Sequence, residues 1–231
     1  MKQQILKKTA DGSFTIYLPE MGEQYHSMNG AITESNHVFI EKGYLFNKEI
    51  NPSVFEVGFG TGLNCLLTIL QAQKFKRPTV YYSVEKYPLS IEVAQKLDYG
   101  SFFSDEACKW FGKIHSCPWE QEIQISEYFR LCKLKTDLAQ AKCPESKKFD
   151  VIYFDAFGPD KQPQMWTPDI FGKIAGMTKD TGVFVTYSAK GQVRRDLTTA
   201  GYKMERLPGP PGKKQMLRGI KVDSNLQLPK N

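Results

Sequence analysis

The chain has 231 residues and a net charge of +6, with 41% hydrophobic and 24% charged residues. This length suits one large domain, or a domain with a small appendage, and the composition is that of a soluble globular protein. No apolar run reaches the ~18 residues that a membrane span needs. The first residues, MKQQILKKTADG, show no secretory signal, so we expect a cytoplasmic protein with no membrane partner.

The first fifty residues predict a small β extension. Two short strands are expected within 5–18, around an Asp11-Gly12 turn. A loop with a helical turn should follow over 19–36, and a helix or an irregular segment over 37–46.

From Pro52 onward, apolar strands alternate with helices. One helix should begin at Pro88, one should be capped by Thr167 with Pro168 at its first position, and one should end at Gly201. The strands are expected within 53–62, 80–87, 129–137, 149–157, 182–188, 202–207 and 214–222, and the helices within 63–75, 88–97, 167–177 and 192–202.

This alternation predicts an α/β fold in which a mostly parallel sheet of seven strands carries helices on both faces. Ligands in such sheets bind at the carboxyl ends of the strands. The segment 101–127 is longer than a usual connection, and we predict a helical insertion there.

Metal and hydrolase chemistry find no support in the sequence. The cysteines form no CxxC pair, and the histidines have no ligand spacing with each other or with a cysteine. We therefore predict no bound metal and reduced thiols, and the absence of a GxSxG sequence argues against a hydrolase. The residues concerned are Cys65, Cys108, Cys117, Cys132, Cys143, His26, His37 and His115.

A glycine-rich turn follows the strand that begins at Ser53. Gly58, Gly60 and Gly62 let the backbone approach a ligand closely, and the next helix presents free N–H groups. A flavin or nicotinamide would place its pyrophosphate there. The carboxylate of Glu56 suits an ammonium better than a phosphate, and S-adenosylmethionine carries an ammonium and no phosphate. The motif therefore favours S-adenosylmethionine.

Two more acids follow strands that should end at the same edge. Glu85 could accept both ribose hydroxyls of a bound nucleoside, although it could also be a surface residue paired with Lys86. Asp137 could accept a hydrogen bond from the adenine amino group, but a loop aspartate is often only a turn residue.

Asp155, followed by Ala156 and Phe157, ends the fourth of these strands. A carboxylate there can hold a neutral amine and take its proton, and the aromatic ring can stabilise the developing cation. This pattern suits methylation of nitrogen. The alternative is a capping or turn aspartate.

The excess positive charge lies in one segment. Residues 190–231 carry ten Lys or Arg and three Asp or Glu, whereas the other 189 residues carry 21 basic and 22 acidic groups. Such a surplus can attract a nucleic acid, and its alternative is a solvated basic face.

Taken together, these stretches resemble the methyltransferase domain that completes 5-methylaminomethyl-2-thiouridine at the wobble position of tRNA. The similar segments are YHS at 25–27, NGA at 29–31, ES at 34–35, EVGFGTGLN at 56–64, SVEKYPL at 83–89, DAFGP at 155–159, MWTP at 165–168, VRRDL at 193–197, GY at 201–202 and GKKQML at 212–217. The resemblance covers nearly the whole chain. It implies a Rossmann-like class I fold that uses S-adenosylmethionine.

The resemblance also implies roles for individual residues. Asp155 is the catalytic base and a cofactor neighbour, and Leu63, Asn64 and Lys86 join the acids and glycines at the cofactor. The uridine is expected to meet His26, Glu34, Phe157, Pro159, Met165, Trp166 and Tyr187, with stacking as the main contact. The phosphates of tRNA are expected to meet Lys190, Arg194, Arg195, Lys213, Lys214 and Arg218.

Members of the family are often fused to an FAD-dependent oxidoreductase, and no such half is present in this sequence, so we expect a stand-alone, monomeric methyltransferase without FAD. Its aminomethyl substrate would come from upstream enzymes. Two departures stand out: Ala156 replaces a glycine that is common in the fused form, and PGPPG at 208–212 replaces glycine-phenylalanine-glycine. We expect an N-terminal extension over 1–50, a methyltransferase domain over 51–222 and a tail over 223–231.

Two other functions compete with this one. The first is methylation of a small-molecule or protein amine by an enzyme of the same fold, against which the basic C-terminal surplus counts. The second is a non-catalytic module that binds RNA, which would need neither Glu56 nor Asp155.

Overall fold

The structure, a computed structural model, describes residues 3–141 and 147–223. It opens with a three-stranded antiparallel sheet in the order β1-β2-β3, formed by Ile5–Lys8, Phe14–Leu18 and Glu23–Gln24. The predicted pair of strands around Asp11-Gly12 is therefore confirmed. Cys143 and the predicted tail beyond Asp223 lie outside the described residues.

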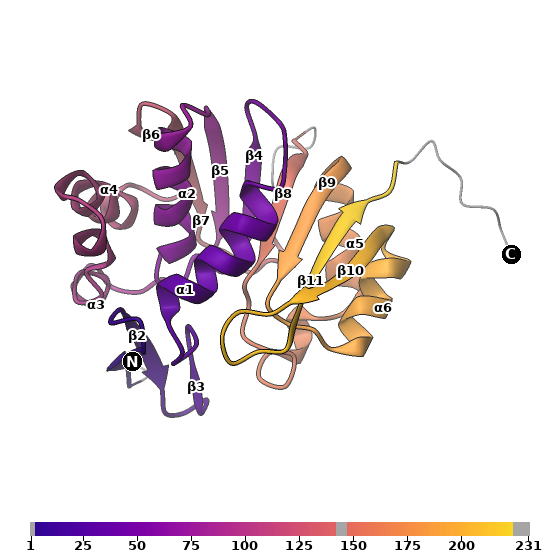
Figure 1. Cartoon of the computed structure of the whole chain (residues 1–231), viewed down its shortest axis with the longest axis horizontal. Coiled ribbons are helices and arrows are strands. Elements are labelled where there is room, and N and C mark those ends of the chain that lie inside the picture. Colours follow the sequence, from indigo (N-terminus) through magenta and orange to yellow (C-terminus); the bar gives the residue numbers. More distant parts are fainter. Residues whose placement is uncertain (1–2, 142–146, 224–231) are drawn as a thin grey trace, which may run out of the picture.

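The central sheet has eight strands in the order β10-β11-β9-β8-β4-β5-β7-β6 (Figure 1). The five strands from β9 to β7 run parallel, and β11, β10 and β6 are antiparallel additions at the two edges. The strands are β4 (Ser53–Val57), β5 (Thr79–Val84), β6 (Glu122–Ser126), β7 (Phe129–Leu134), β8 (Phe149–Phe154), β9 (Thr178–Thr186), β10 (Tyr202–Pro208) and β11 (Gln215–Lys221).

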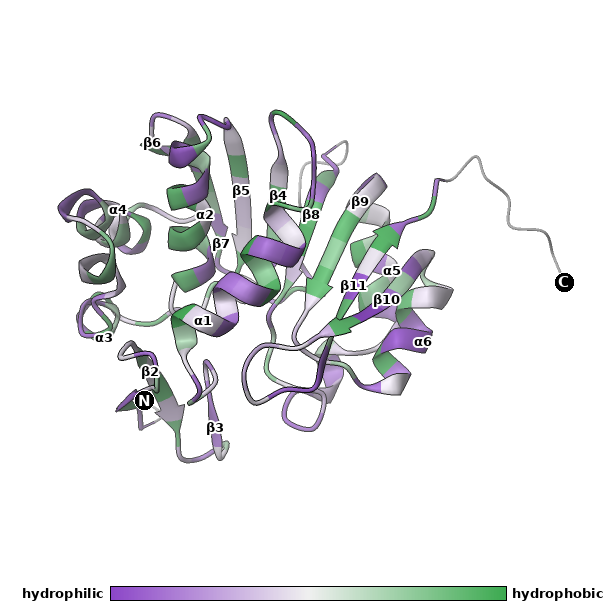
Figure 2. Cartoon of the chain, viewed as in Figure 1, coloured by the Kyte–Doolittle hydropathy of each residue, from purple (hydrophilic) through white to green (hydrophobic). Residues whose placement is uncertain are grey.

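Helices cover both faces of this sheet, as predicted. One face packs against α1 (Ala31–Ser35), η1 (Asn36–Tyr44), α2 (Leu63–Lys74) and α4 (Asp105–Ser116), and the other against α5 (Pro168–Met177) and α6 (Gly191–Thr199). Because side chains alternate along a strand, Val54 belongs to the first core and Phe55 to the second. Strand β9, for example, shows green hydrophobic segments in Figure 2. Shorter helices are α3 (Ile91–Gln95), η2 (Tyr99–Phe102) and η3 (Pro163–Met165).

The segment 37–46 forms most of a π-helix, η1, which continues directly from α1. It crosses β8 and β9 closely at Gly43, where an added Cβ would lie 2.9 Å from Val185 and 3.2 Å from Tyr153. The N-terminal segment thus supplies one of the helices that cover the main sheet.

Two sequence predictions need correction. The insertion 101–127 is only partly helical, because residues 122–126 form edge strand β6, which makes the sheet eight-stranded rather than seven-stranded. The helix expected from Pro88 begins at Ile91, because the Ser90 side chain accepts the amide of Val93 and forms the cap. By contrast, Thr167 caps α5 and Pro168 is its first residue, as predicted.

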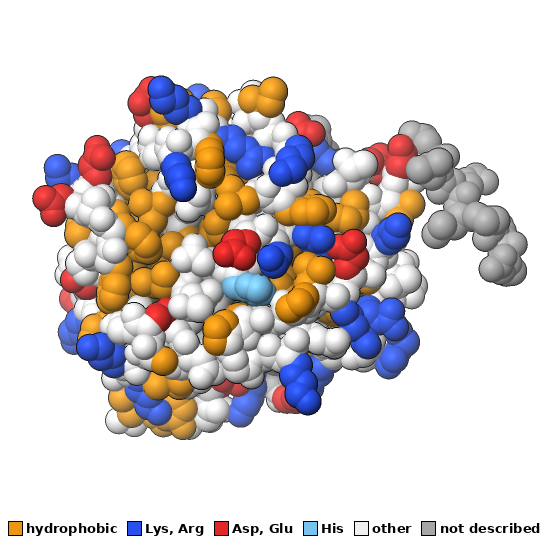
Figure 3. Space-filling model, viewed as in Figure 1, with side chains coloured by type: hydrophobic (Ala, Val, Ile, Leu, Met, Phe, Trp, Pro, Cys, Tyr) orange, Lys and Arg blue, Asp and Glu red, His pale blue; other side chains and the backbone are white. Residues whose placement is uncertain are grey.

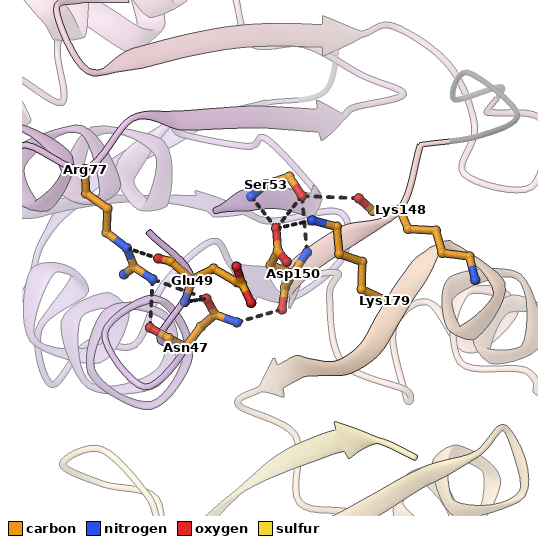
Figure 4. A network of polar contacts seen from close by, with 7 residues as sticks. All are labelled: Asn47, Glu49, Ser53, Arg77, Lys148, Asp150 and Lys179. Carbon is orange, nitrogen blue, oxygen red and sulfur yellow. Dashed lines mark hydrogen bonds and ion pairs between the residues drawn. The ribbon is translucent and has the colours of Figure 1, made fainter. Parts of the chain in front are cut away.

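A polar network fixes the connection into β4 at the sheet edge opposite to its carboxyl ends (Figure 4). Asp150 accepts the backbone amide and the hydroxyl of Ser53, both at 2.7 Å, and pairs with Lys179 at 2.9 Å. Arg77 donates to the carbonyl oxygens of Glu49 and Asn47, both at 2.7 Å. This network anchors the start of β4 and so sets the position at which the strand ends.

Candidate active site

A cavity of about 1350 Å³ lies at the carboxyl ends of β4, β5 and β8. Residues of the N-terminal extension form one side of it, and Lys213 reaches it from the β10–β11 loop. Backbone hydrogen bonds join the ends of these strands beside the cavity. The amide of Gly58 donates to the carbonyl of Val84, and the amide of Asp155 donates to the carbonyl of Val57, both at 3.0 Å. A cavity is therefore present at the edge of the sheet where the sequence predicted a bound ligand.

The glycine turn follows the sequence prediction. Gly58 has φ +90°, and an added Cβ would lie 2.9 Å from the carbonyl oxygen of Asp155. Gly62 has φ +74°, and its added Cβ would lie 2.9 Å from the His115 ring. Any other residue at these positions would strain the backbone and collide with a neighbour. Gly58, Gly60 and Leu63 line the cavity, whereas Gly62 supports the turn from behind.

Glu56 is not on the cavity wall. The pleat of β4 points its side chain to the same face as Val54, beneath α2, where it is fully buried and accepts the Ser83 hydroxyl at 2.7 Å. Its other carboxylate oxygen has no hydrogen-bond partner among the described residues. Burial raises the pKa of Glu56 to about 8. Direct contact of Glu56 with the cofactor ammonium stays a prediction, which this placement does not favour.

Glu85, Lys86 and Asp137 all line the cavity. Glu85 accepts the backbone amides of Gly60 at 3.0 Å and Tyr87 at 2.8 Å, which ties the end of β5 to the glycine turn. Lys86 pairs with Asp137 at 2.9 Å, and this bond holds the pKa of the Asp137 carboxyl below its usual value. The alternative pairing of Glu85 with Lys86 is not what the structure shows.

Asn64 and Asp155 form the floor between the two halves of the cavity. Asn64 donates to the Asp155 carboxylate at 2.7 Å, while its own amide oxygen is buried and has no hydrogen-bond partner within 3–141 and 147–223. Burial raises the pKa of Asp155 to about 7. The carboxylates of Asp155 and Glu85 on the cavity wall are acceptors that suit a cationic ligand, so these residues fit S-adenosylmethionine.

Aromatic side chains line the part of the cavity that lies beyond Asp155 from the glycine turn, which we call the acceptor half. Phe157, Met165 and Tyr187 line it, as does Tyr25, whose ring lies 5.1 Å edge-on from that of Phe157. Trp166 does not line it: the indole is buried and donates to the Phe157 carbonyl at 2.8 Å, so it supports the wall from behind. Pro159 is likewise outside the lining.

His26, Glu34 and Lys213 enter the same half of the cavity. His26 bonds to the Thr61 hydroxyl at 2.7 Å, and burial lowers its pKa to about 4, so it is neutral at pH 7. Glu34 and Lys213 form an ion pair at 2.6 Å. Lys213, expected at a phosphate, is instead a cavity residue.

The other basic residues expected at phosphates lie outside the cavity. Lys190 pairs with Asp160, and Arg218 pairs with Glu205 at 2.8 Å while its guanidinium lies 3.6 Å over the Phe46 ring. Lys214 and Arg195 are exposed, and the Nε of Arg194 is buried. Basic side chains gather over α6 and β10 on the face shown in Figure 3.

Sequence reasoning missed three residues that shape the site. Tyr25 packs its ring 3.1 Å from the point where a Cβ on Gly60 would lie, Thr61 holds His26, and Gln162 accepts the Phe157 amide at 3.1 Å. Tyr25 stands beside His26 in the YHS stretch, which was the one signal that could have indicated it.

Neither a membrane-spanning helix nor a cluster of metal ligands occurs within 3–141 and 147–223. A glycine turn, acids at successive strand ends and a cavity beside them define a Rossmann-like class I methyltransferase that uses S-adenosylmethionine.

Known proteins agree with this class. A family model described as S-adenosyl-L-methionine-dependent methyltransferase matches residues 84–222, and the chain belongs to that family. The structure of MnmC2 from Aquifex aeolicus superimposes with a TM-score of 0.75 and 25% identity, covering 96% of this chain and 72% of that one. The predicted fold is thereby confirmed.

The sequence is also similar to two proteins named tRNA 5-methylaminomethyl-2-thiouridine biosynthesis bifunctional protein MnmC. The protein from Nitrosospira multiformis is 30% identical over 218 residues, covering 88% of this chain and 35% of the relative. The one from Leptospira interrogans is 32% identical over 220 residues, covering 88% and 33%. The chain thus spans about a third of the length of these curated relatives.

Proposed function

We propose that this enzyme methylates the primary amine of 5-aminomethyl-(2-thio)uridine at the tRNA wobble position, giving 5-methylaminomethyl-(2-thio)uridine. The observation that carries the proposal is Asp155: a half-buried carboxyl at the end of β8, between the glycine turn and an aromatic half-cavity. The names of the relatives, which concern biosynthesis of this nucleoside, support the choice of substrate.

The chemistry required of the protein is alignment and removal of a proton. S-adenosylmethionine, when bound, supplies an activated methyl group on a sulfonium. Asp155 accepts a hydrogen bond from the amine and takes the proton that its ammonium form carries, so that the nitrogen lone pair is directed toward the cofactor half of the cavity. As the N–C bond forms, the S–CH3 bond would break, S-adenosylhomocysteine would leave, and the positive charge would pass from sulfur to the methylated nitrogen. A base with a pKa of about 7 is well matched to this task near neutral pH.

We assign the part of the cavity that is lined by the glycine turn, Glu85 and the Lys86–Asp137 pair to the cofactor, and call it the cofactor half. Gly58, Gly60 and Asn64 would lie against its amino-acid portion, Glu85 against the ribose, and the Lys86–Asp137 pair at the adenine end. Phe157, Met165 and Tyr187 would enclose the uracil. Glu56 would support the glycine turn from beneath, and Trp166 the aromatic wall from behind.

For the partner, we propose that exposed Arg195 and Lys214 meet tRNA phosphates, and that upstream enzymes supply the aminomethyl group. The basic surplus within 190–231 supports a polyanionic substrate. We also propose that the protein acts in the cytoplasm, where its substrate would be found, and as a monomer.

The test is transfer of label from S-adenosylmethionine. Three acceptors are compared: tRNA from cells blocked at the aminomethyl stage, the same tRNA already carrying the methylated nucleoside, and a small primary amine. We expect label only in the first. Label in the small amine alone would favour the competing small-molecule activity, and binding of tRNA without any transfer would favour the non-catalytic module.

A further inference from the structure

The β10–β11 loop, residues 209–214, reaches across the molecule to the N-terminal extension (Figure 1). Its turn is closed by the amide of Lys213 bonding to the carbonyl of Pro210 at 2.9 Å. Gly212, at φ +84°, packs against Asn29 so closely that a Cβ would overlap its side chain. This packing directs Lys213 inward, away from the exposed Lys214.

Lys213 is held there by two specific contacts. Its ammonium is 2.6 Å from Glu34 Oε1 and 3.9 Å above the centre of the Tyr187 ring. The second Glu34 oxygen accepts the Ser27 amide at 2.8 Å. The Tyr187 hydroxyl donates to the carbonyl of Ala156 at 2.9 Å, so the ring under Lys213 abuts the residue next to Asp155.

The charges around the acceptor half are therefore arranged in a definite way. Glu34 and Lys213 cancel one another, and His26 is neutral, so the sum over these three residues and Asp155 is the single negative charge of Asp155. The titratable or charged groups around Asp155, Glu34 and Lys213 are Glu23, Tyr25, His26, Tyr187, Lys161, buried Glu56 and, toward the start of α1, Asp11.

We propose that Lys213 is a positioning residue of the acceptor site, which neutralises Glu34 so that Asp155 stays ionised and the bound amine stays uncharged, and that it is not a phosphate contact. This inference rests on the proposed function for its effect on methyl transfer. Without Lys213, two carboxylates would face the amine. They would favour the protonated, unreactive ammonium and would also raise the pKa of Asp155.

The test is the pH dependence of turnover in charge variants. For Lys213→Met we expect the rise of kcat to move up by about one pH unit, with about a fivefold loss at pH 7 that is recovered at higher pH. Glu34→Gln should move the rise downward, and the double variant, whose cavity charge is restored, should return close to the wild-type profile. Lys213→Arg should keep the wild-type profile, and Lys109→Met, at an exposed lysine on α4, is the matched control.

Titration of the Asp155 carboxyl by carbon-detected NMR needs no tRNA, and so separates this inference from the proposed function. The Asp155 midpoint should rise in Lys213→Met and fall in Glu34→Gln. Unmoved midpoints in folded variants would overturn the inference, as would a loss of kcat without a shifted profile. A lower salt dependence of tRNA binding in Lys213→Met, with the wild-type dependence kept in Lys213→Arg, would also overturn it, because it would show a phosphate contact. A wild-type enzyme that transfers no methyl group to tRNA would instead overturn the proposed function.

Discussion

Asp155 ends β8 with its carboxylate held by Asn64 at 2.7 Å and its pKa raised to about 7 by burial. Free alkylamines are protonated at neutral pH, with a pKa of roughly 10.4 for lysine, so the enzyme must remove a proton before the nitrogen can attack. Below pH 7 Asp155 is itself protonated and cannot act, so we expect wild-type kcat to rise as the pH increases through about 7.

Asp155→Asn keeps the shape and the hydrogen bond but loses the basicity. We expect the variant to bind S-adenosylmethionine within a small factor of wild type and to lose ~10²–10⁴-fold in kcat, with residual turnover that increases with pH. Steady-state kinetics and calorimetry measure both quantities. Near-normal turnover at neutral pH would remove Asp155 as the base and direct attention to Tyr187 or to water.

Glu85 tests the cofactor half at the same scale. Glu85→Ala should weaken S-adenosylmethionine binding at least tenfold, because hydrogen bonds to charged groups contribute about 1.5–3 kcal/mol each. In Glu85→Ala the amides of Gly60 and Tyr87 would also lose their acceptor. Because a glutamine can still accept these hydrogen bonds, the affinity of Glu85→Gln for S-adenosylmethionine should lie between those of wild type and Glu85→Ala. Calorimetry showing wild-type affinity in both folded variants would exclude a ribose contact.

At the scale of the element, β4 carries an ionisable group into the core. Glu56 has a pKa of about 8 in the folded protein and near 4.3 in the unfolded chain. At pH values between these two, the carboxyl of Glu56 therefore takes up a proton when the protein folds. The stability that the protonated carboxyl gives is present below the unfolded pKa and is lost as the pH rises through about 8.

Glu56→Gln removes this dependence. Relative to wild type, we expect the variant to gain on the order of 1.4 kcal/mol per pH unit between pH 4.5 and 8, and to keep a constant advantage above that. Urea unfolding across this range measures the difference. A pH-independent difference would mean that Glu56 is ionised in the folded chain.

The elements also show which parts of the fold a sequence can predict. Strands β5, β7 and β8 were predictable from their apolar runs, and because parallel strands end at one edge of the sheet, Glu85, Asp137 and Asp155 could be expected to lie together. Strand β6 was missed although EIQIS alternates polar and apolar residues, because this short edge strand lies inside the segment 101–127, which was predicted as one helical insertion. The buried orientation of Glu56 could have been predicted, because residues two apart on a strand point to the same face and Val54 is apolar.

At the scale of the whole molecule, the position of Lys213 depends on packing between segments 179 residues apart in sequence. Its sequence context, two adjacent lysines beyond a Gly-Pro turn, is the same for the inward Lys213 and the exposed Lys214. Only the contact of the β10–β11 loop with α1 and Asn29 separates them, so a basic surplus could be recognised from the sequence but not divided into cavity and surface residues.

The exposed part of that surplus makes a separate prediction. Arg195→Ala with Lys214→Ala should weaken binding of tRNAs of different sequence about equally, and should lower the slope of log affinity against log salt by roughly 0.7–0.9 per lost phosphate contact. Affinity for S-adenosylmethionine should not change. Lys109→Ala, an exposed lysine on α4, serves as the control. An unchanged slope in the double variant would make this surface a solvated face.

The most direct measurement is the identity of the methylated nucleoside. Wobble-modified tRNA arrested at the aminomethyl stage is incubated with S-adenosylmethionine and the wild-type protein, digested to nucleosides and resolved by mass spectrometry. The account predicts that 5-aminomethyl-(2-thio)uridine is consumed and that an equal amount of a nucleoside heavier by one CH₂, with the methyl group on the side-chain nitrogen, replaces it. A methyl group on a ring atom, on ribose or on another nucleoside, or an unchanged 5-aminomethyl-(2-thio)uridine pool, would contradict it.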